Sequence, residues 1–249
     1  TTALTNVFIA IAIGGGIGSS VVISQYLGAR QLDNMKKAIT TTLINFVVLS
    51  VVMAAFGLVF CDHILTALNT PDNVFSDART YLSIYFWGLP FLFLYNVCTG
   101  IFTALGDSRT PLYFLIGSSL GNIFLDFWFV AGLGLGVAGV AWATFIAQGI
   151  SAVLALVTLR FRLTKISCEG RPRLFDWVLL GQIAAIAVPS ILQQSVLSVG
   201  NMFVQEIVNR YGSAVIAGYS GAIKLNTFAI NSFMALGSCL SSYTAQNLG

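Results

Sequence analysis

The chain has 249 residues, of which 57% are hydrophobic and only 8% are charged. Soluble globular domains carry about 25% charged residues, so this composition excludes an ordinary water-soluble fold. The formal net charge of +3 is too small to indicate a nucleic-acid partner. The cysteines at 61, 98, 168 and 239 show no C-x-x-C spacing, which argues against a zinc site or a disulfide framework.

Apolar runs of membrane-spanning length recur along the chain. A helix needs about 20 mostly apolar residues to cross about 30 Å of hydrocarbon. Seven segments fit this pattern, at residues 3–26, 38–60, 80–104, 111–131, 138–160, 178–208 and 214–245. The sequence therefore predicts an all-α, polytopic membrane helix bundle. Because the chain begins inside an apolar run and without a methionine, we expect it to be part of a longer protein.

Basic residues divide unevenly between the connecting loops. Residues 27–37, 105–110 and 160–176 carry nine of them: Arg30, Lys36, Lys37, Arg109, Arg160, Arg162, Lys165, Arg171 and Arg173. The alternate loops carry only Arg79 and Arg210. Basic loops stay on the cytoplasmic side of a membrane. The first set is therefore predicted to be cytoplasmic, in a multi-pass protein of the plasma (inner) membrane.

The first and last segments resemble one another when the chain is shifted by 221 residues, and both end in a Q-x-L-G motif, which begins at Gln25 and at Gln246. Six crossings separate the two segments, so they run in the same direction and the repeat is parallel, as in transporters built from two similar halves. We expect two lobes. Residues 1–165 would form most of the first, 166–177 a cytoplasmic linker, and 178–249 the first two helices of the second.

Five motifs follow one another in a familiar order: SQYLGAR from Ser24, YLSIYFWGLP from Tyr81, GDSRTP from Gly106, NIFLD from Asn122 and GVAGVAWAT from Gly136. Together they resemble the multidrug and toxic compound extrusion (MATE) family. The resemblance implies that the segments are the family's second to eighth helices. It also implies a central cleft that faces outward and inward in turn, exporting organic cations while protons or sodium ions enter.

Asp126 is the strongest single candidate for a functional site, because an ionisable group within an apolar span is costly. It lies fifteen residues beyond Pro111, or about 22 Å along a helix, and Asn122 is one turn earlier on the same face. Thr144 lies at nearly the same depth in the following segment. These oxygens could bind a hard cation, although an aspartate reaching interfacial water is the alternative. The resemblance assigns all three residues to the family's cation site.

Three further polar residues lie within the last two segments. Lys224 is about ten residues into its span, where a lysine needs a partner, a wet cavity or a route to the interface. Both a role in the substrate cleft and a structural role remain open for it. Gln193 and Gln194 lie midway along residues 178–208, where some members of the family have an acid. These glutamines could contact substrate as polar groups in the cleft.

Two glycine-rich stretches superficially fit nucleotide-binding patterns. The G-x-G-x-x-G motif from Gly134 follows a run of membrane length and lacks the acid that a dinucleotide fold requires about twenty residues later. The stretch Gly14-Gly15-Gly16-Ile17-Gly18 lacks the lysine of a phosphate loop. Small residues in a membrane span instead favour close helix packing.

Three functions remain: a multidrug exporter, a flippase for lipid-linked sugars, and an integral-membrane enzyme. A flippase for pyrophosphate lipids needs a strongly cationic cleft, yet Lys224 is the only basic residue well inside the predicted spans. An enzyme needs clustered acids, histidines or metal ligands, which the loops do not provide. We therefore favour a proton- or sodium-coupled antiporter for small organic, cationic substrates. We expect no cofactor beyond the coupling ion, contact with membrane lipid, and a monomer when the protein is full length.

Overall fold

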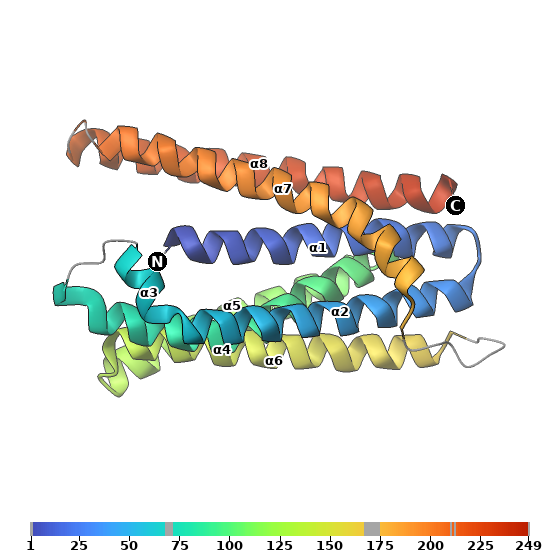
Figure 1. Ribbon diagram of the computed structural model, residues 1–249, viewed down its shortest axis with the longest axis horizontal. Coiled ribbons are helices and arrows are strands. Elements are labelled where there is room, and N and C mark those ends of the chain that lie inside the picture. Colours follow the sequence, from blue (N-terminus) through green and yellow to red (C-terminus); the bar gives the residue numbers. More distant parts are fainter. Residues whose placement is uncertain (1, 68–71, 167–174, 210, 212, 249) are drawn as a thin grey trace.

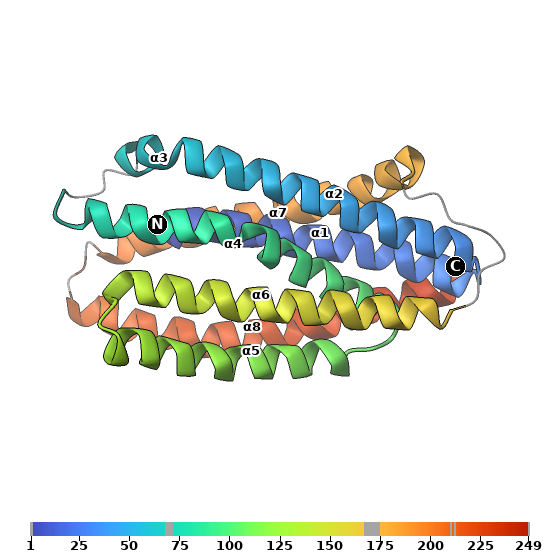
Figure 2. The same cartoon turned by 90° about the horizontal axis from the view of Figure 1, so that it is seen from below.

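The computed structural model describes the chain except for residues 1, 68–71, 167–174, 210, 212 and 249. Its helices are α1 (Thr2–Gly28), α2 (Leu32–Val59), α3 (Cys61–Ala67), α4 (Asp72–Ala104), α5 (Arg109–Phe127), the π-helix η1 (Trp128–Gly132), α6 (Gly136–Thr164), α7 (Trp177–Asn209) and α8 (Ser213–Leu248). The described residues contain no strand. The long helices lie side by side along one axis (Figures 1 and 2), which confirms the predicted all-α bundle.

Six of these helices are long and apolar enough to cross a membrane: α1, α2, α4, α5 together with η1, α6, and α7. The seventh predicted segment, 214–245, forms α8, whose described part is not among the six because polar residues such as Lys224, Ser241 and Ser242 interrupt it. It nevertheless runs along the length of the bundle like the other long helices (Figures 1 and 2), and it contacts α1. The short α3, which follows α2, was not predicted.

The connections gather at the two ends of the bundle in the predicted alternation. The last residues of α1, α4 and α6 and the first residues of α2, α5 and α7 lie at one end, and the opposite ends of these helices lie at the other (Figures 1 and 2). We call the first the basic end. Arg171 and Arg173 of the predicted linker are outside the described residues. Which side of a membrane the basic end faces stays a prediction.

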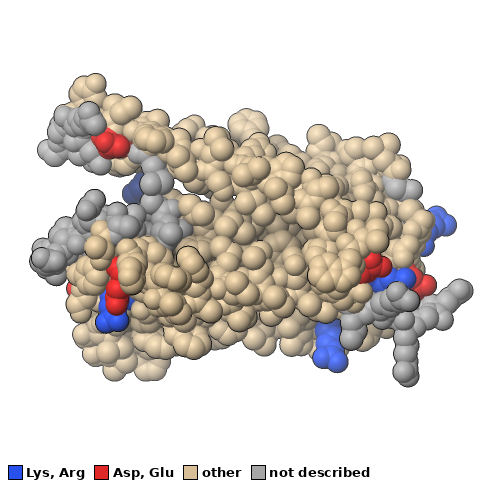
Figure 3. Space-filling view, in the orientation of Figure 1, with Lys and Arg blue, Asp and Glu red and all other residues tan. Residues whose placement is uncertain are grey.

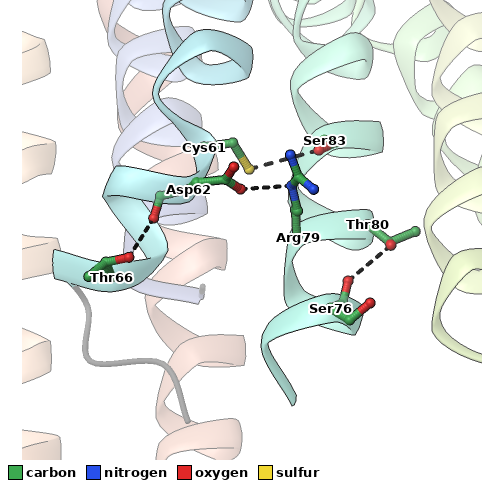
Figure 4. Close-up of polar contacts among 7 residues, drawn as sticks. All are labelled: Cys61, Asp62, Thr66, Ser76, Arg79, Thr80 and Ser83. Carbon is green, nitrogen blue, oxygen red and sulfur yellow. Dashed lines mark hydrogen bonds and ion pairs between the residues drawn. The ribbon is translucent and has the colours of Figure 1, made fainter. Parts of the chain in front are cut away.

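At the opposite end, α3 is tied to α4 by polar contacts (Figure 4). Asp62 Oδ1 lies 2.7 Å from Arg79 Nε, and Cys61 Sγ lies 3.8 Å from Ser83 Oγ. The ion pair is half exposed, so it stabilises the fold by only about 0.5 kcal/mol. Asp62 thereby compensates the charge of Arg79, one of the few basic groups at this end.

Helix α1 lies at the centre of the bundle, and glycines let α7 pack directly on its backbone. A Cβ atom added at Gly14 would lie 2.8 Å from Ile191 N, and one at Gly18 would lie 2.6 Å from Ala187 N. No side chain fits into either space. The Gly-x-x-x-Gly spacing places both residues on one face of α1, as in close-packed membrane helices, which confirms the packing interpretation of this stretch.

The other two glycines of the stretch serve different neighbours. Gly15 faces the ring of Phe46 on α2, and a Cβ atom added at Gly16 would lie 3.1 Å from Asn96 O on α4. Successive residues on a helix point about 100° apart, so neighbouring glycines open different faces of α1. Helix α1 is accordingly the most buried of the six candidate spans.

The turn between α4 and α5 explains how α4 ends and how α5 begins. Gly106 adopts φ +79°, a left-handed conformation that glycine adopts without strain. It donates from its N to Thr103 O at 3.0 Å, while Asp107 N donates to Phe102 O at 2.8 Å. This is the Schellman pattern, which satisfies two of the last carbonyls of a helix. The carbonyl of Ala104 is left for other donors.

Asp107 then caps the start of α5. Its carboxylate accepts hydrogen bonds from Arg109 N and Thr110 N, both at 3.1 Å, and pairs with Arg162 Nη2 of α6 at 2.6 Å. Burial by itself raises the pKa of this carboxyl, but the hydrogen bonds from Thr110 and the charge of Arg162 outweigh it, so the pKa is lowered. One aspartate thus joins three helices at the basic end.

Helices α7 and α8 are anchored at the basic end and separate from the other helices toward the opposite end. The described buried residues of α7 are Leu179, Ile183 and Ala187, all before Pro189. Those of α8 are Ser242 and Ala245, near its last turn. Figure 3 shows the surface hollowed between this pair and the other helices at the end away from the basic loops. The described arrangement is therefore closed at the basic end and open at the other.

Candidate cation-binding site

The structure brings Asn122 of α5 and Thr144 of α6 together. Asn122 Nδ2 donates to Thr144 Oγ1 at 3.4 Å, although the two residues come from different helices that run in opposite directions. Counting residues from the helix ends had predicted that Thr144 lies at nearly the depth of Asp126, one turn beyond Asn122. The contact leaves the amide oxygen of Asn122 free to face another ligand.

Asp126 lies one turn further along α5, and its side chain is half buried. Its Oδ1 atom is buried and has no hydrogen-bond partner among the described residues. A buried carboxylate oxygen without a partner is unfavourable unless a proton or another cation compensates it. Immediately after this turn, α5 passes into the π-helix η1, a widening that is frequent near functional sites.

A narrow cavity adjoins Thr144 on its α4 side. It measures about 10 Å³ and is lined by Tyr81, Tyr85, Thr144 and Gln148, among others. This is about the smallest space that can hold one water molecule. Tyr85 is oriented by a hydrogen bond from its hydroxyl to Thr5 O at 3.4 Å. Two phenols and an amide therefore extend the polar surroundings of Thr144 toward the centre of the bundle.

The predicted cleft residues lie apart from this group. On α7, Gln193 is exposed and Gln194 is half buried, and Lys224 on α8 is exposed. Among the described residues, no hydrogen bond or ion pair connects the side chains of these three residues with one another. All three lie on the stretches of α7 and α8 that separate from the other helices, and their role in substrate binding stays a prediction.

A larger cavity of about 200 Å³ lies between α1, α4 and α8. Its polar lining is neutral and consists mostly of hydroxyl groups: Ser20, Asn96, Thr99, Thr103, Ser238, Ser241 and Ser242. Such a surface can hold water or the polar part of a solute without imposing a charge. The cavity lies in the half of the bundle nearer the basic end, because its α8 lining comes from the last turns of that helix.

Sequence comparison identifies the family. The sequence profile of the family described as MatE matches residues 1–128 and 189–249. The chain belongs to the MATE family. A MATE transporter solved in the straight conformation has the same fold, with a TM-score of 0.86, 23% identity, and coverage of 98% of this chain and 54% of that one. The predicted family and the transporter fold are therefore confirmed.

Two relatives come from Bacillus subtilis (strain 168). The probable multidrug resistance protein YoeA is 33% identical over 97% of this chain and 54% of its own length. The probable multidrug resistance protein YpnP is 31% identical over 92% of this chain and 51% of its own length. This MATE chain thus spans about half the length of the curated relatives it matches.

Sequence reasoning missed several polar residues of this MATE chain. Tyr81 and Gln148 were not singled out, because a phenol or an amide in a membrane span is too common to indicate a site without its neighbours. The hydroxyl-lined cavity was missed for a similar reason. Serine and threonine occur throughout apolar helices, and only the packing of α1, α4 and α8 shows which of them share a space.

Proposed function

We propose that this chain is part of a cation-coupled antiporter that exports small organic cations by alternating access. The observation that carries the proposal is the buried, unpartnered Oδ1 of Asp126, one turn from the contact between Asn122 and Thr144. A negative group in this position is satisfied only when a cation arrives. Asp126 is accordingly the residue that binds the coupling ion.

The coupling ion is a proton or sodium. A proton neutralises Asp126 directly, whereas sodium compensates its charge and takes further oxygen ligands from Asn122 and Thr144. Either event changes the local charge by one unit. It drives transport only if one conformation binds the cation better than the other, because a ligand shifts an equilibrium by its differential affinity. The ends of α5 and α6 carry that change to the neighbouring helices.

The cargo is inferred to be a small cationic or neutral organic molecule. The names of YoeA and YpnP, which describe probable multidrug resistance proteins, support drug export. Among the described residues, Lys224 is the one basic residue far from both ends of the bundle, and it lies on the exposed part of α8. This charge distribution does not favour a flippase, which would need a cationic cleft for pyrophosphate lipids.

The complete protein is expected to work as a monomer in the plasma membrane, in contact with lipid and with no cofactor besides the coupling ion. The loops 27–37, 105–110 and 160–176 face the cytoplasm in this proposal, because they hold most of the basic residues. The described arrangement, closed at the basic end, then corresponds to an outward-open state.

The test is export from membrane vesicles that hold a transport-competent protein containing residues 1–249. A fluorescent organic cation is the substrate, and proton and sodium gradients are imposed separately. Asp126→Asn keeps the shape of the side chain and removes the charge, so gradient-driven export should fall to the level of empty vesicles. The matched control is Asp77→Asn, which alters an exposed aspartate near the start of α4 and should export normally.

Full gradient-driven export by Asp126→Asn would contradict the assignment of the coupling site. Export by neither the unaltered protein nor its variants, under either gradient, would contradict the proposed substrate class. Correct insertion of both variants is checked by their yield and by size-exclusion chromatography in detergent.

A further inference from the structure

Helix α8 makes a specific polar contact with α1 and α4 near the basic end. Gln246 Nε2 donates to Ala104 O at 2.6 Å, and the hydroxyl oxygens of Ser20 and Ser242 lie 3.0 Å apart. Both serines are buried. These contacts join residues 142 and 222 positions apart in the chain, so they bring the end of α8 onto the first helices of the bundle.

The end of α4 provides the acceptor for this contact. The Schellman turn uses the carbonyls of Phe102 and Thr103, while the carbonyl of Ala104 has no donor from the turn. Ser24 Oγ approaches it at 3.5 Å, and Gln246 supplies the short bond. The last carbonyls of a helix in a membrane protein need hydrogen-bond donors from outside the helix. Gln246 of α8 therefore satisfies the Ala104 carbonyl, which has no donor from α4 or its turn.

Close backbone packing accompanies these hydrogen bonds. A Cβ atom added at Gly28 would lie 2.9 Å from Gln246 Cα and nearer still to its carbonyl, so the last turns of α1 and α8 touch directly. On the α7 side of the same end, the Tyr26 hydroxyl donates to Gln182 Oε1 at 2.8 Å. The last turns of α1 and α8 are therefore in direct contact, while an open groove of about 560 Å³, lined by Tyr26, Gln182 and Leu248 among others, remains on the α7 side.

The contact closes one side of the hydroxyl-lined cavity. Ser20 and Ser242 belong both to the contact and to the cavity lining, and Thr103 lines the cavity one residue before Ala104. Beyond the cavity, the described residues of α8 are mostly exposed. The contact thus separates the cavity from the basic end.

We propose that Ser20, Gly28, Ser242 and Gln246 form a latch that holds the basic end shut, and that each export cycle requires this latch to open. The proposal rests on alternating access as the proposed function. When α8 moves away from α1, Ala104 O and both hydroxyls exchange their partners for water. The net change per neutral hydrogen bond is small, so binding of a cation or substrate can shift the equilibrium between the two states.

A reversible cross-link tests whether the latch must open. Ser20→Cys and Ser242→Cys are introduced together in a cysteine-free, transport-competent protein that contains residues 1–249. The oxygens they replace are 3.0 Å apart, so mild oxidation should form a disulfide. We expect export to fall at least about tenfold, the factor that corresponds to about 1.4 kcal/mol, and to return on reduction. Each single variant should export equally with and without oxidant.

A second measurement tests the hydrogen bond of Gln246 without any transported substrate. Thr103→Cys, in the cavity wall, is labelled by a membrane-impermeant thiol reagent applied at the basic end. Adding Gln246→Leu removes one hydrogen bond and should speed labelling about fivefold. The matched control is Asn247→Leu, because Asn247 is exposed and its side-chain amide donates to Tyr243 O of its own helix; it should not change the rate.

Each outcome decides the proposal. Failure of the cysteine pair to cross-link, export by the cross-linked protein at the control rate, or equal labelling in the Gln246 and Asn247 variants would overturn the latch. Failure of the unaltered protein to export any organic cation would instead overturn the proposed function. The cross-linking and labelling rates would still report on the latch in that case, because neither depends on the cargo.

Discussion

The backbone contact between α1 and α7 predicts a large and specific effect for Gly18→Ala. The added Cβ atom would lie 2.6 Å from Ala187 N and 2.7 Å from Ala187 Cα, against an ordinary contact of about 3.5 to 4.0 Å between carbon atoms. The obstruction is backbone, so no side-chain rotation relieves it and the helices must separate by about 1 Å. Overpacking of this kind costs about 1 to 3 kcal/mol.

Gly117→Ala is the matched control, because it is also a mid-helix glycine and a Cβ atom there meets nothing within 4 Å. Alanine stabilises a free helix position by about 0.5 to 1 kcal/mol relative to glycine. Because this gain applies to both helical positions, the two variants should differ in stability by the overpacking cost of about 1 to 3 kcal/mol, with Gly18→Ala the less stable.

The measurement is the thermal unfolding midpoint in detergent, followed by reaction of buried cysteines with a fluorescent thiol dye. For a chain of this size, each kcal/mol shifts the midpoint by about 2 to 4 °C, so the midpoint of Gly18→Ala should lie at least about 2 °C below that of Gly117→Ala. A midpoint equal to or above that of the control would refute the direct packing of α7 on α1.

Three other outcomes are expected. Asp107→Ala, which removes the α5 cap and the pair with Arg162, should destabilise the protein by about 2 kcal/mol at neutral pH. Because the pKa of Asp107 is lowered in the folded state, its contribution is lost as pH falls through that value, and acid titration of unfolding should show the two proteins converging. Thr144→Ala should impair sodium-driven export more than proton-driven export, because a proton needs no ligand cage; equal loss in vesicles under both gradients would contradict this. A cysteine introduced at Ser167 should resist an impermeant reagent added outside intact cells, and outside labelling would show that the predicted topology is wrong.

The sequence predicted that parts of α5 and α6 lie near one another because helical geometry is regular. A rise of 1.5 Å per residue set Thr144 nearly level with Asp126, and the structure records a contact of Thr144 with Asn122, one turn before Asp126. The helix limits were less predictable. Helix α4 begins at Asp72, eight residues before the predicted apolar run at 80, because backbone hydrogen bonding continues after a helix leaves the hydrocarbon. Apolarity marks the part of a helix that crosses a membrane, and not the whole helix.

The contacts between distant segments could not be predicted in the same way. Gln246 was noted as part of a repeated motif, but nothing near it in the sequence indicates Ala104 as its partner. The unsatisfied carbonyl exists only because Gly106 turns the chain after α4. The same holds for Tyr81, which becomes a neighbour of Thr144 through the packing of α4 on α6. Gln148 lies one turn after Thr144 on α6, so helical spacing alone makes these two residues neighbours.

Composition and loop charge by themselves determined that this chain is a multi-pass helical membrane protein, and its motifs determined the family, because hydrocarbon requires long apolar helices with internally satisfied backbones. Only the tertiary structure decided where α7 and α8 lie against α1. Their positions depend on small residues such as Gly14, Gly18 and Gly28 and on hydrogen bonds between segments far apart in the chain. Local sequence specifies each helix, whereas packing specifies which faces meet and therefore which end of the bundle is closed.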